Sequence, residues 1–417
     1  MLRLTLFWLS CNQIPTESYL SLCVDTTNYV EGGKSLIAGG AEYEHAFFSF
    51  GPVYPLFVAG MFLLFGLSAL PIILVQILLS AVSCGLIYSL ARHLTGSRAI
   101  SIVAGGLAAL SITSIELSCF VLSDTLYLFT VLVGLNLLMR GLDRCHLLLS
   151  AASGLVFGVA VLMRSIGQFW PLVIVAIAAT VYFKGKTSRS DCRIYRTQIV
   201  QCAAACLAIL LIFELGWIAR NQAVHGLPTL AFTSASGPAT VAALSLNDET
   251  DRYYRDTMGV WLTDYYAQTN TTSISAEDYF RLLQRKAREI FAANPVRMIK
   301  AYLRLCRTNV NDVTYLHRDL VPAFNPKTIP IEHYLKEHYL NYASFVLSIL
   351  GLIILTLTRR WHIAVVLGTI YFYYALMVGA FPWQGSRLFY PGLIADSILI
   401  AVVIVGVGSL LKVIKRH

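Results

Sequence analysis

Apolar runs of about the length needed to cross a membrane alternate with short polar segments from residue 69 to the end of the chain. About 20 apolar residues in a helix span the ~30 Å hydrocarbon core of a bilayer. We therefore predict an all-α polytopic membrane protein with nine spanning helices. Their predicted bounds are Leu70 to Ala91, Ala99 to Leu117, Thr125 to Met139, Leu147 to Met163, Ile166 to Phe183, Ile199 to Ala219, Tyr342 to Leu357, His362 to Ala380 and Leu388 to Leu411.

The apolar stretch from Leu4 to Leu9 near the N-terminus is too short to span. We interpret it as a truncated first helix, which would bring the number of transmembrane helices to about ten. The segment from Val53 to Phe65 is also apolar, but Pro52 precedes it and Gly66 follows it. It therefore fits an interfacial helix as well as it fits a span.

Basic residues gather in every second connection between the predicted spans. By the positive-inside rule these connections face the cytoplasm. They carry Arg92, Arg98, Arg140, Arg144, Lys184, Lys186, Arg189, Arg193, Arg196, Arg359, Arg360, Lys412, Lys415 and Arg416. The rule places the C-terminus inside the cell and two long polar segments outside it, Asn12 to Phe50 and Arg220 to about Leu340.

These patterns divide the chain into four predicted parts. Residues 1–68 hold the truncated first helix and a first extracytoplasmic loop with interfacial helices, and residues 69–219 form a transmembrane bundle. Residues 220–340 form a small, mainly helical extracytoplasmic domain, and residues 341–417 form the C-terminal transmembrane helices. Within the third part, the polar start at Ser275 and the amphipathic run from Tyr279 to Ala293 predict a helix.

The composition agrees with a multi-pass protein of the cell (inner) membrane. Hydrophobic residues make up 57% of the chain and charged residues only 13%, and the mean hydropathy is +0.65. A soluble fold could not bury so much apolar surface. The net charge of +9 comes from basic residues between apolar runs, so we predict no nucleic-acid partner. The nine cysteines are scattered without a CxxC pair and are interpreted as small apolar fillers.

Asp25 and Tyr29 stand four residues apart in the first outer segment and would share one face of a helix. A carboxylate at the outer membrane surface is suited to act as a general base. An aspartate near a helix start is also commonly a capping or solvated residue. The residues around this pair favour the first interpretation.

A series of short motifs follows Asp25 in a fixed order along the chain. The motifs are Asp25-Thr-Thr-Asn-Tyr29, Leu36-Ile-Ala-Gly-Gly40, Tyr43, Gly51-Pro-Val-Tyr-Pro55, Phe65-Gly66, Ser123-Asp-Thr-Leu-Tyr127, Leu162-Met-Arg-Ser-Ile-Gly167, Ala219-Arg-Asn221, His225-Gly226 and Arg387-Leu-Phe-Tyr-Pro391. This order resembles the GT-C membrane glycosyltransferases, in particular the bacterial branch related to protein O-mannosyltransferases and lipid A aminoarabinose transferases. One departure is Thr26, because the mannosyltransferases carry a tandem Asp-Glu at Asp25 and the next position.

The resemblance implies a hexosyl- or pentosyltransferase of the cell envelope. Such an enzyme takes a sugar from a polyprenyl-phosphate donor and passes it, with inversion, to an extracytoplasmic lipid, glycan or protein acceptor. Inversion at the anomeric carbon requires a base beside the attacking hydroxyl and cations on the leaving phosphate. The resemblance assigns the base to Asp25 and substrate contacts to Tyr29 and Tyr390.

Four cationic residues at predicted outer positions are candidates for binding the donor phosphate. Arg164, Arg220 and Arg387 lie at outer helix ends, where a guanidinium can pair bidentately with a lipid headgroup or simply reach the membrane surface. Lys34 is a weaker candidate, equally suited to a solvated position. Asp124, at the mouth of a span, is either a second catalytic acid or part of a Ser-Asp helix cap.

No cofactor is required by the sequence, although a divalent cation is left open. Outer histidines such as His45 and His225 could bind a metal together with Glu44, but their spacing lacks a strict ligand pattern. Three alternative functions also remain open: a secondary transporter, a polysaccharide polymerase or ligase, and a non-catalytic assembly subunit. A transporter would be expected to show internal repeats and charges at the midplane, whereas the sequence shows no repeat and its acids cluster at the predicted outer surface.

Overall fold

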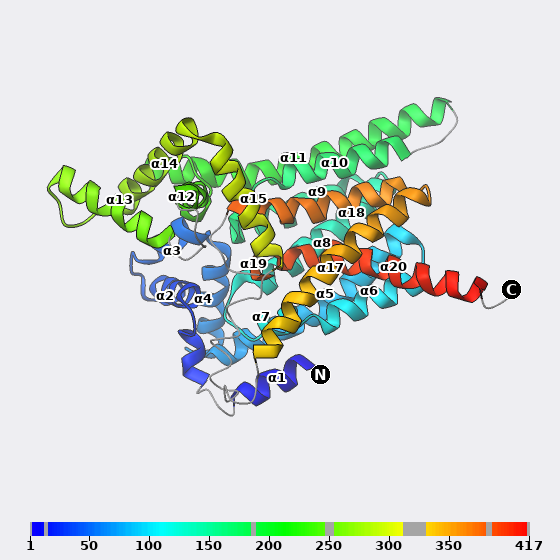
Figure 1. The fold of residues 1–417 in the computed structure, drawn as a ribbon, viewed down its shortest axis with the longest axis horizontal. Helices are drawn as coiled ribbons and strands as arrows, with labels where there is room; N and C mark the ends of the chain where they lie inside the picture. The colour runs from blue at the N-terminus through cyan, green and yellow to red at the C-terminus, as the bar shows by residue number, and fades with distance from the viewer. Residues whose placement is uncertain are drawn as a thin grey trace.

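The computed structural model describes residues 2–11, 16–184, 189–246, 254–311, 331–380 and 386–414. Every regular element in these residues is helical (Figure 1). The first part contains α1 (Leu2–Cys11), the 3-10 turn η1 (Thr16–Leu20), α2 (Val24–Ala38), α3 (Tyr43–Phe50) and α4 (Val53–Phe65). The predicted all-α architecture is therefore confirmed.

Two groups of helices, most of them long, form the bundle. The first group is α5 (Ala69–Thr95), α6 (Arg98–Leu110), α7 (Ile112–Leu117), α8 (Ser123–Asp143), α9 (Leu147–Met163), η2 (Ser165–Gly167), α10 (Trp170–Lys184) and α11 (Arg189–His225). The second group is α17 (Ile331–Leu357), α18 (Trp361–Met377), η4 (Val378–Ala380), α19 (Ser386–Phe389), η5 (Tyr390–Gly392) and α20 (Leu393–Ile414). Between them lie α12 (Phe232–Leu246), α13 (Tyr254–Thr269), α14 (Ala276–Ala293) and α15 (Pro295–Asn311).

Seven of the described helical segments are long and apolar enough to cross a membrane. Two further predicted spans correspond to shorter apolar helices, α6 and α9. The prediction of one continuous helix from Ala99 to Leu117 is wrong. Ser111 has an extended backbone between α6 and α7, and its hydroxyl accepts a hydrogen bond from the amide of Ser114, which starts a new helix.

The helix α4 has 13 residues, fewer than the ~20 that a span requires. It packs against α2 rather than into the centre of the bundle. Of the two interpretations of this segment, the interfacial helix therefore fits the observed length better. Figure 1 shows α2, α3 and α4 beside α12, α13 and α14 at one end of the bundle.

The opposite end of the bundle carries the basic turns. Arg360, before α18, donates a hydrogen bond of 3.4 Å to the carbonyl of Thr95, at the end of α5. His93, also in α5, lies 2.8 Å from Asp143 at the end of α8. These contacts bring the α5–α6, α8–α9 and α17–α18 turns together, as the predicted alternation of sides requires.

Close helix contacts in the bundle depend on small residues. Gly154 and Gly158 of α9 face α11, and a Cβ atom built on Gly154 would lie 2.3 Å from the carbonyl oxygen of Cys206. Such small-xxx-small pairs allow backbones in a membrane to approach one another closely. The core of the bundle is filled by large buried side chains, including Tyr127, Phe157 and Trp170.

The segment between the two helix groups packs around α12. Ala239 and Ala243 of α12 meet Trp261 of α13 and Leu283 of α14 in a separate apolar cluster. The hydroxyl of Ser275 caps α14 by accepting a hydrogen bond of 3.0 Å from the amide of Asp278. The amphipathic helix predicted for this segment is therefore present, and its start is the predicted one.

Candidate active site

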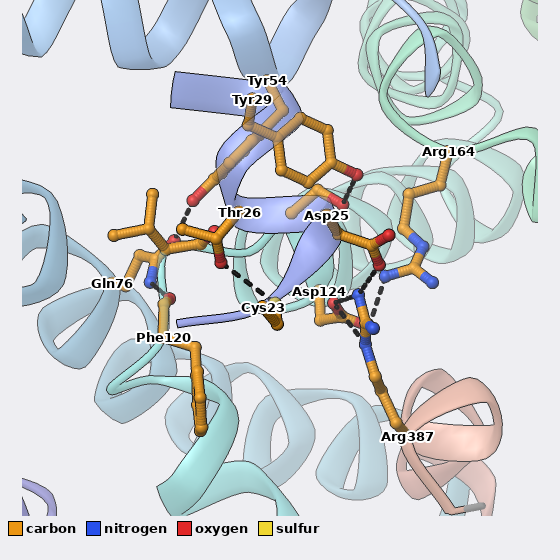
Figure 2. A network of polar contacts seen from close by, with 12 residues as sticks. Cys23, Asp25, Thr26, Tyr29, Tyr54, Gln76, Phe120, Asp124, Arg164 and Arg387 are labelled. Carbon is orange, nitrogen blue, oxygen red and sulfur yellow. Dashed lines mark hydrogen bonds and ion pairs between the residues drawn. The ribbon is translucent and has the colours of Figure 1, made fainter. Parts of the chain in front are cut away.

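Four charged side chains from distant segments meet where α2 lies against the mouth of the bundle (Figure 2). Asp25 and Asp124 occupy the first turns of α2 and α8, where the helix dipole favours a negative charge. Arg164 follows α9 in an extended conformation, and Arg387 belongs to the short helix α19. Extended residues before α2 and α8 turn each helix start toward this point.

Arg387 bridges the two carboxylates. Its Nη2 atom donates a hydrogen bond of 2.7 Å to Oδ2 of Asp25 and one of 3.2 Å to Oδ2 of Asp124. Its Nε atom lies 3.3 Å from the same Asp124 oxygen. The rigid fork of a guanidinium suits such a bridge, because its donors lie in one plane.

Asp124 is held from both sides. Arg164 forms an ion pair with Oδ1 of Asp124, while Arg387 binds Oδ2. The Asp124 side chain is only 1% exposed, so an unpaired charge here would be strongly destabilising. The N-cap of α8 is Leu122, without a side-chain cap hydrogen bond, so the interpretation of Asp124 as part of a helix cap is wrong.

The exposure of the two carboxylates differs. The Asp25 side chain is 23% exposed, whereas that of Asp124 is almost completely buried. Two aspartates and two arginines give the cluster no net formal charge. Asp25 is thus the more accessible of the two carboxylates, and the buried Asp124 is placed to orient the two guanidinium groups.

A layer of uncharged hydrogen bonds fixes α2 beneath this cluster. The Tyr29 hydroxyl lies 3.0 Å from the hydroxyl of Ser123, and Thr26 donates to the carbonyl of Val121 at 3.1 Å. Tyr29 is buried, which raises the pKa of its hydroxyl. The structure thus places Tyr29, a predicted substrate contact, in the packing that supports Asp25.

Tyr54, from the Gly51–Pro55 motif, and Gln76, which the sequence analysis did not single out, complete this layer. The ring of Tyr54 packs edge-on against Tyr29 at 4.7 Å, and its hydroxyl donates to Oε1 of Gln76 at 2.7 Å. Gln76 in turn donates to the carbonyl of Phe120. The glutamine inside an otherwise apolar span was the available signal for this network.

Lys34 and Tyr390, two other predicted site residues, make their described polar contacts with residues outside the four-residue cluster. Lys34 pairs with Glu31 at 2.9 Å on the outer part of α2, and its side chain is 39% exposed. The Tyr390 hydroxyl lies 3.2 Å from that of Ser114. Ser114 also accepts a hydrogen bond of 2.9 Å from the buried Arg3 of α1.

Arg220 belongs to a second charged cluster, which joins α3, the end of α11 and α14. It pairs with Glu44, whose other oxygen lies 2.8 Å from Nε2 of His225. Nδ1 of His225 lies 2.9 Å from Glu277. Burial alone would raise the pKa of Glu44, but Arg220 and His225 hold it below its ordinary value. The hydrogen bond from His225 likewise lowers the pKa of Glu277.

Known proteins share parts of this architecture. Residues 49–217 match the model of the PMT_2 family, described as Dolichyl-phosphate-mannose-protein mannosyltransferase. The archaeal oligosaccharyltransferase AglB from Archaeoglobus fulgidus, in complex with an inhibitory peptide and a dolichol-phosphate, matches with a TM-score of 0.50 at 12% identity. That match covers 100% of this chain and 51% of AglB. The chain therefore spans about half the length of this solved structure.

The chain has the GT-C fold of membrane glycosyltransferases. A second structure of the Archaeoglobus fulgidus oligosaccharyltransferase, in complex with Zn and sulfate, also matches with a TM-score of 0.50 and 12% identity, over 99% of this chain and 49% of that one. ArnT from Cupriavidus metallidurans bound to undecaprenyl phosphate is more distant, with a TM-score of 0.38 and 14% identity over 96% of this chain and 76% of ArnT. No curated protein matches the chain significantly.

The GT-C fold explains why the motifs of the sequence converge. The first loop, the start of α8, the end of α9 and the start of the last span meet at one end of the bundle. Asp25, Asp124, Arg164 and Arg387 stand at these four points. The predicted resemblance to this group of enzymes is confirmed.

Proposed function

We propose that this GT-C protein is a glycosyltransferase that moves a sugar from a polyprenyl-phosphate donor, with inversion, to a lipid, glycan or protein acceptor outside the cytoplasm. The observation that carries the proposal is the bridge from Arg387 to Asp25 and Asp124, completed by Arg164. The description of the matching family names dolichyl-phosphate-mannose, and the AglB structure contains dolichol-phosphate. Dolichyl-phosphate-mannose is a sugar on a polyprenyl-phosphate carrier, and dolichol-phosphate is such a carrier without a sugar.

The reaction needs one base and a site for a leaving phosphate. The acceptor hydroxyl attacks the anomeric carbon while the bond between that carbon and the phosphate oxygen breaks. Asp25 accepts the hydroxyl proton, because it is the accessible carboxylate of the cluster. The products are the glycosylated acceptor and polyprenyl phosphate, and the proton passes from Asp25 to the water outside.

The arginines stabilise the charge that grows on the phosphate. Arg387 and Arg164 lie on either side of Asp124, and each guanidinium carries several donors in one plane. Asp124 is a positioning residue in this scheme, since it holds both guanidinium groups and is itself buried. Arg220 and Lys34 are paired with other acids and receive no step in the reaction.

A divalent cation fits these residues poorly. Asp25 and Asp124 are each bound to an arginine, and a third acidic, histidine or cysteine ligand does not join them in the described part of the chain. Like charge from the two guanidinium groups would oppose a metal ion at this point. We therefore assign no step to a metal.

The proposed location of the active site is the extracytoplasmic face of the cell (inner) membrane. The cluster lies at the end of the bundle that carries α2 and α12–α14, away from the basic turns. The positive-inside rule places those basic turns in the cytoplasm. Cysteines introduced before Pro52 should react with an impermeant thiol reagent added outside the cell, and protection from that reagent would contradict the orientation.

Transfer of label from a radiolabelled polyprenyl-phosphate-sugar tests the activity in membranes that contain the protein. Asp25→Asn is expected to lower the rate by about 10²- to 10⁴-fold, the usual contribution of a general base. Glu31→Gln is the matched control, because Glu31 is an exposed acid on the same helix that pairs only with Lys34 in the described contacts. Equal transfer by the wild type and Asp25→Asn would remove the assigned base.

A further inference from the structure

A partly open cavity of about 90 Å³ lies between α7, α15, α17, α18 and α20, next to the short helix α19 that carries Arg387. Phe389 and Tyr390, two and three positions after Arg387 in α19 and η5, form part of its wall. Asn341, Ser344 and Asp396 supply polar groups, and Tyr371 adds a second aromatic ring. The function proposed above uses none of these polar groups.

Asp396 is an acid inside an apolar spanning segment, a position where a carboxylate is costly without a partner or a function. The hydroxyl groups of Ser344 and Ser348 donate to its two oxygens at 2.5 and 2.6 Å. No described basic side chain forms an ion pair with it. Each carboxylate oxygen keeps capacity for a further donor, since two serine bonds do not saturate its lone pairs.

The aromatic residues give the cavity part of an apolar wall. The rings of Tyr371 and Phe389 pack edge-to-face with centroids 5.3 Å apart. A cavity that combines aromatic surface with a few placed polar groups is typical of a small-molecule site. Sugars match this combination, because a pyranose has an apolar C–H face and hydroxyl donors around its edge.

The size of the cavity limits the ligand. At about 90 Å³ it is much smaller than the roughly 300–1,000 Å³ of typical small-molecule pockets. It therefore suits part of one sugar residue, such as its hydroxyl-bearing edge.

We propose that this cavity binds the hydroxyl groups of one sugar residue, with Asp396 and Ser344 as hydrogen-bonding partners and Tyr371 and Phe389 packed against the ring. The inference deepens the proposed function, on which it rests, by assigning a sugar-binding subsite next to the phosphate-binding arginine. The sugar comes from either the donor or a glycosylated acceptor, since both present the same hydroxyl chemistry.

Equilibrium binding separates these two sources without requiring transfer. Purified full-length protein is titrated with polyprenyl-phosphate-mannose, polyprenyl-phosphate-glucose and bare polyprenyl phosphate, and separately with methyl mannoside and methyl glucoside. If the donor sugar binds here, Asp396→Asn and Ser344→Ala weaken binding of a sugar-bearing lipid about tenfold and leave bare polyprenyl phosphate unchanged. If an acceptor sugar binds here, only the affinity for a methyl glycoside falls.

Ser348→Ala is the matched control, because Ser348 binds Asp396 but does not line the cavity. It is expected to bind all five ligands as the wild type does. If Ser348→Ala lowered the affinity for sugar ligands as much as Ser344→Ala does, Asp396 would serve only in helix packing. That result would overturn the proposal. So would unchanged sugar affinities in both Asp396→Asn and Ser344→Ala.

The outcome is independent of catalysis. A wild type that binds sugar through Asp396 but transfers none would contradict the proposed function and leave the subsite in place. Sugar transfer could instead be lost in Asp25→Asn but stay unchanged in Asp396→Asn and Ser344→Ala. Together with unchanged sugar affinities in those two variants, this result would contradict the subsite alone.

Discussion

Arg387 and Asp25 stand 362 positions apart in the sequence, yet Nη2 of Arg387 lies 2.7 Å from Oδ2 of Asp25. The contact joins the start of the last span to the first loop of the protein. Asp124 shares the same guanidinium, so three segments depend on one side chain. The position of the proposed base is therefore coupled to the position of the arginine that we propose binds the phosphate.

Substitution of Arg387 by lysine tests this coupling. Lysine keeps the positive charge but cannot reach both carboxylates with a planar fork. We expect Arg387→Lys to raise the KM for the polyprenyl-phosphate-sugar at least tenfold and to lower kcat. Arg285→Lys is the control, because Arg285 is 57% exposed on α14 and should tolerate the change. Unchanged kinetics in Arg387→Lys would contradict the bridging role.

Asp124 and Asp25 should differ in their effects on stability. Asparagine at Asp124 leaves two guanidinium groups without their shared buried carboxylate, which costs about 3–5 kcal/mol for a broken buried pair. Asp25 is partly exposed, so Asp25→Asn should cost only about 1 kcal/mol. Thermal unfolding in detergent should therefore show the lower Tm for Asp124→Asn. The reverse order would show that Asp25 is the structural carboxylate.

Much of this cluster could be predicted from the sequence, because each member occupies a helix end with a recognisable local signal. Asp25, Asp124, Arg164 and Arg387 were all candidates, and the structure brings all four together. The spanning helices could be predicted equally well, since the length of an apolar run is a local property of the sequence. The break at Ser111 was missed because one extended residue hardly changes an apolar run.

The second charged cluster could not be predicted, because its pairing depends on how distant segments pack. Glu44 and Arg220 are 176 positions apart, and neither sequence context indicates the other. Arg3 is a similar case, since its partners Ser80 and Ser114 lie in α5 and α7. Asp396 differs: an acid in the last apolar run was visible in the sequence, but only the structure places it in a cavity.

The second cluster predicts a pH dependence of stability. The pKa values of Glu44 and Glu277 are lowered in the folded protein by their contacts with Arg220 and His225. Both groups thus bind protons less readily when folded, so their contribution is complete above the unfolded glutamate pKa of about 4.3. It is lost as the pH falls through the lower folded values.

Thermal unfolding measured from pH 6 to pH 3.5 tests this contribution. The Tm of the wild type should fall more steeply with acidification than that of the double variant Glu44→Gln and Glu277→Gln. Glu289→Gln, an exposed acid on α14, should follow the wild type. Parallel curves for the wild type and the double variant would mean that the cluster does not contribute to folding.

Gly51 provides a test of how the first loop is seated on the bundle. Its φ of +99° lies in a region that side chains rarely adopt, and a Cβ atom would stand 2.3 Å from the carbonyl oxygen of Leu162. Leu162 is two positions before Arg164, so relief of this clash must move α3 and α4 away from an arginine of the active site. Gly51→Ala should therefore lower both the Tm, by several degrees, and the rate of sugar transfer.

Gly39 separates the steric part of this effect from the backbone part. Its φ of +68° is also positive, but a Cβ atom there would meet nothing within 4 Å. Gly39→Ala should cost only about 1 kcal/mol of backbone strain. It should leave the rate of sugar transfer close to that of the wild type, since α2 keeps its position against the bundle. If Gly39→Ala reduced transfer as much as Gly51→Ala, strain in the loop rather than its distance from Leu162 would control the active site.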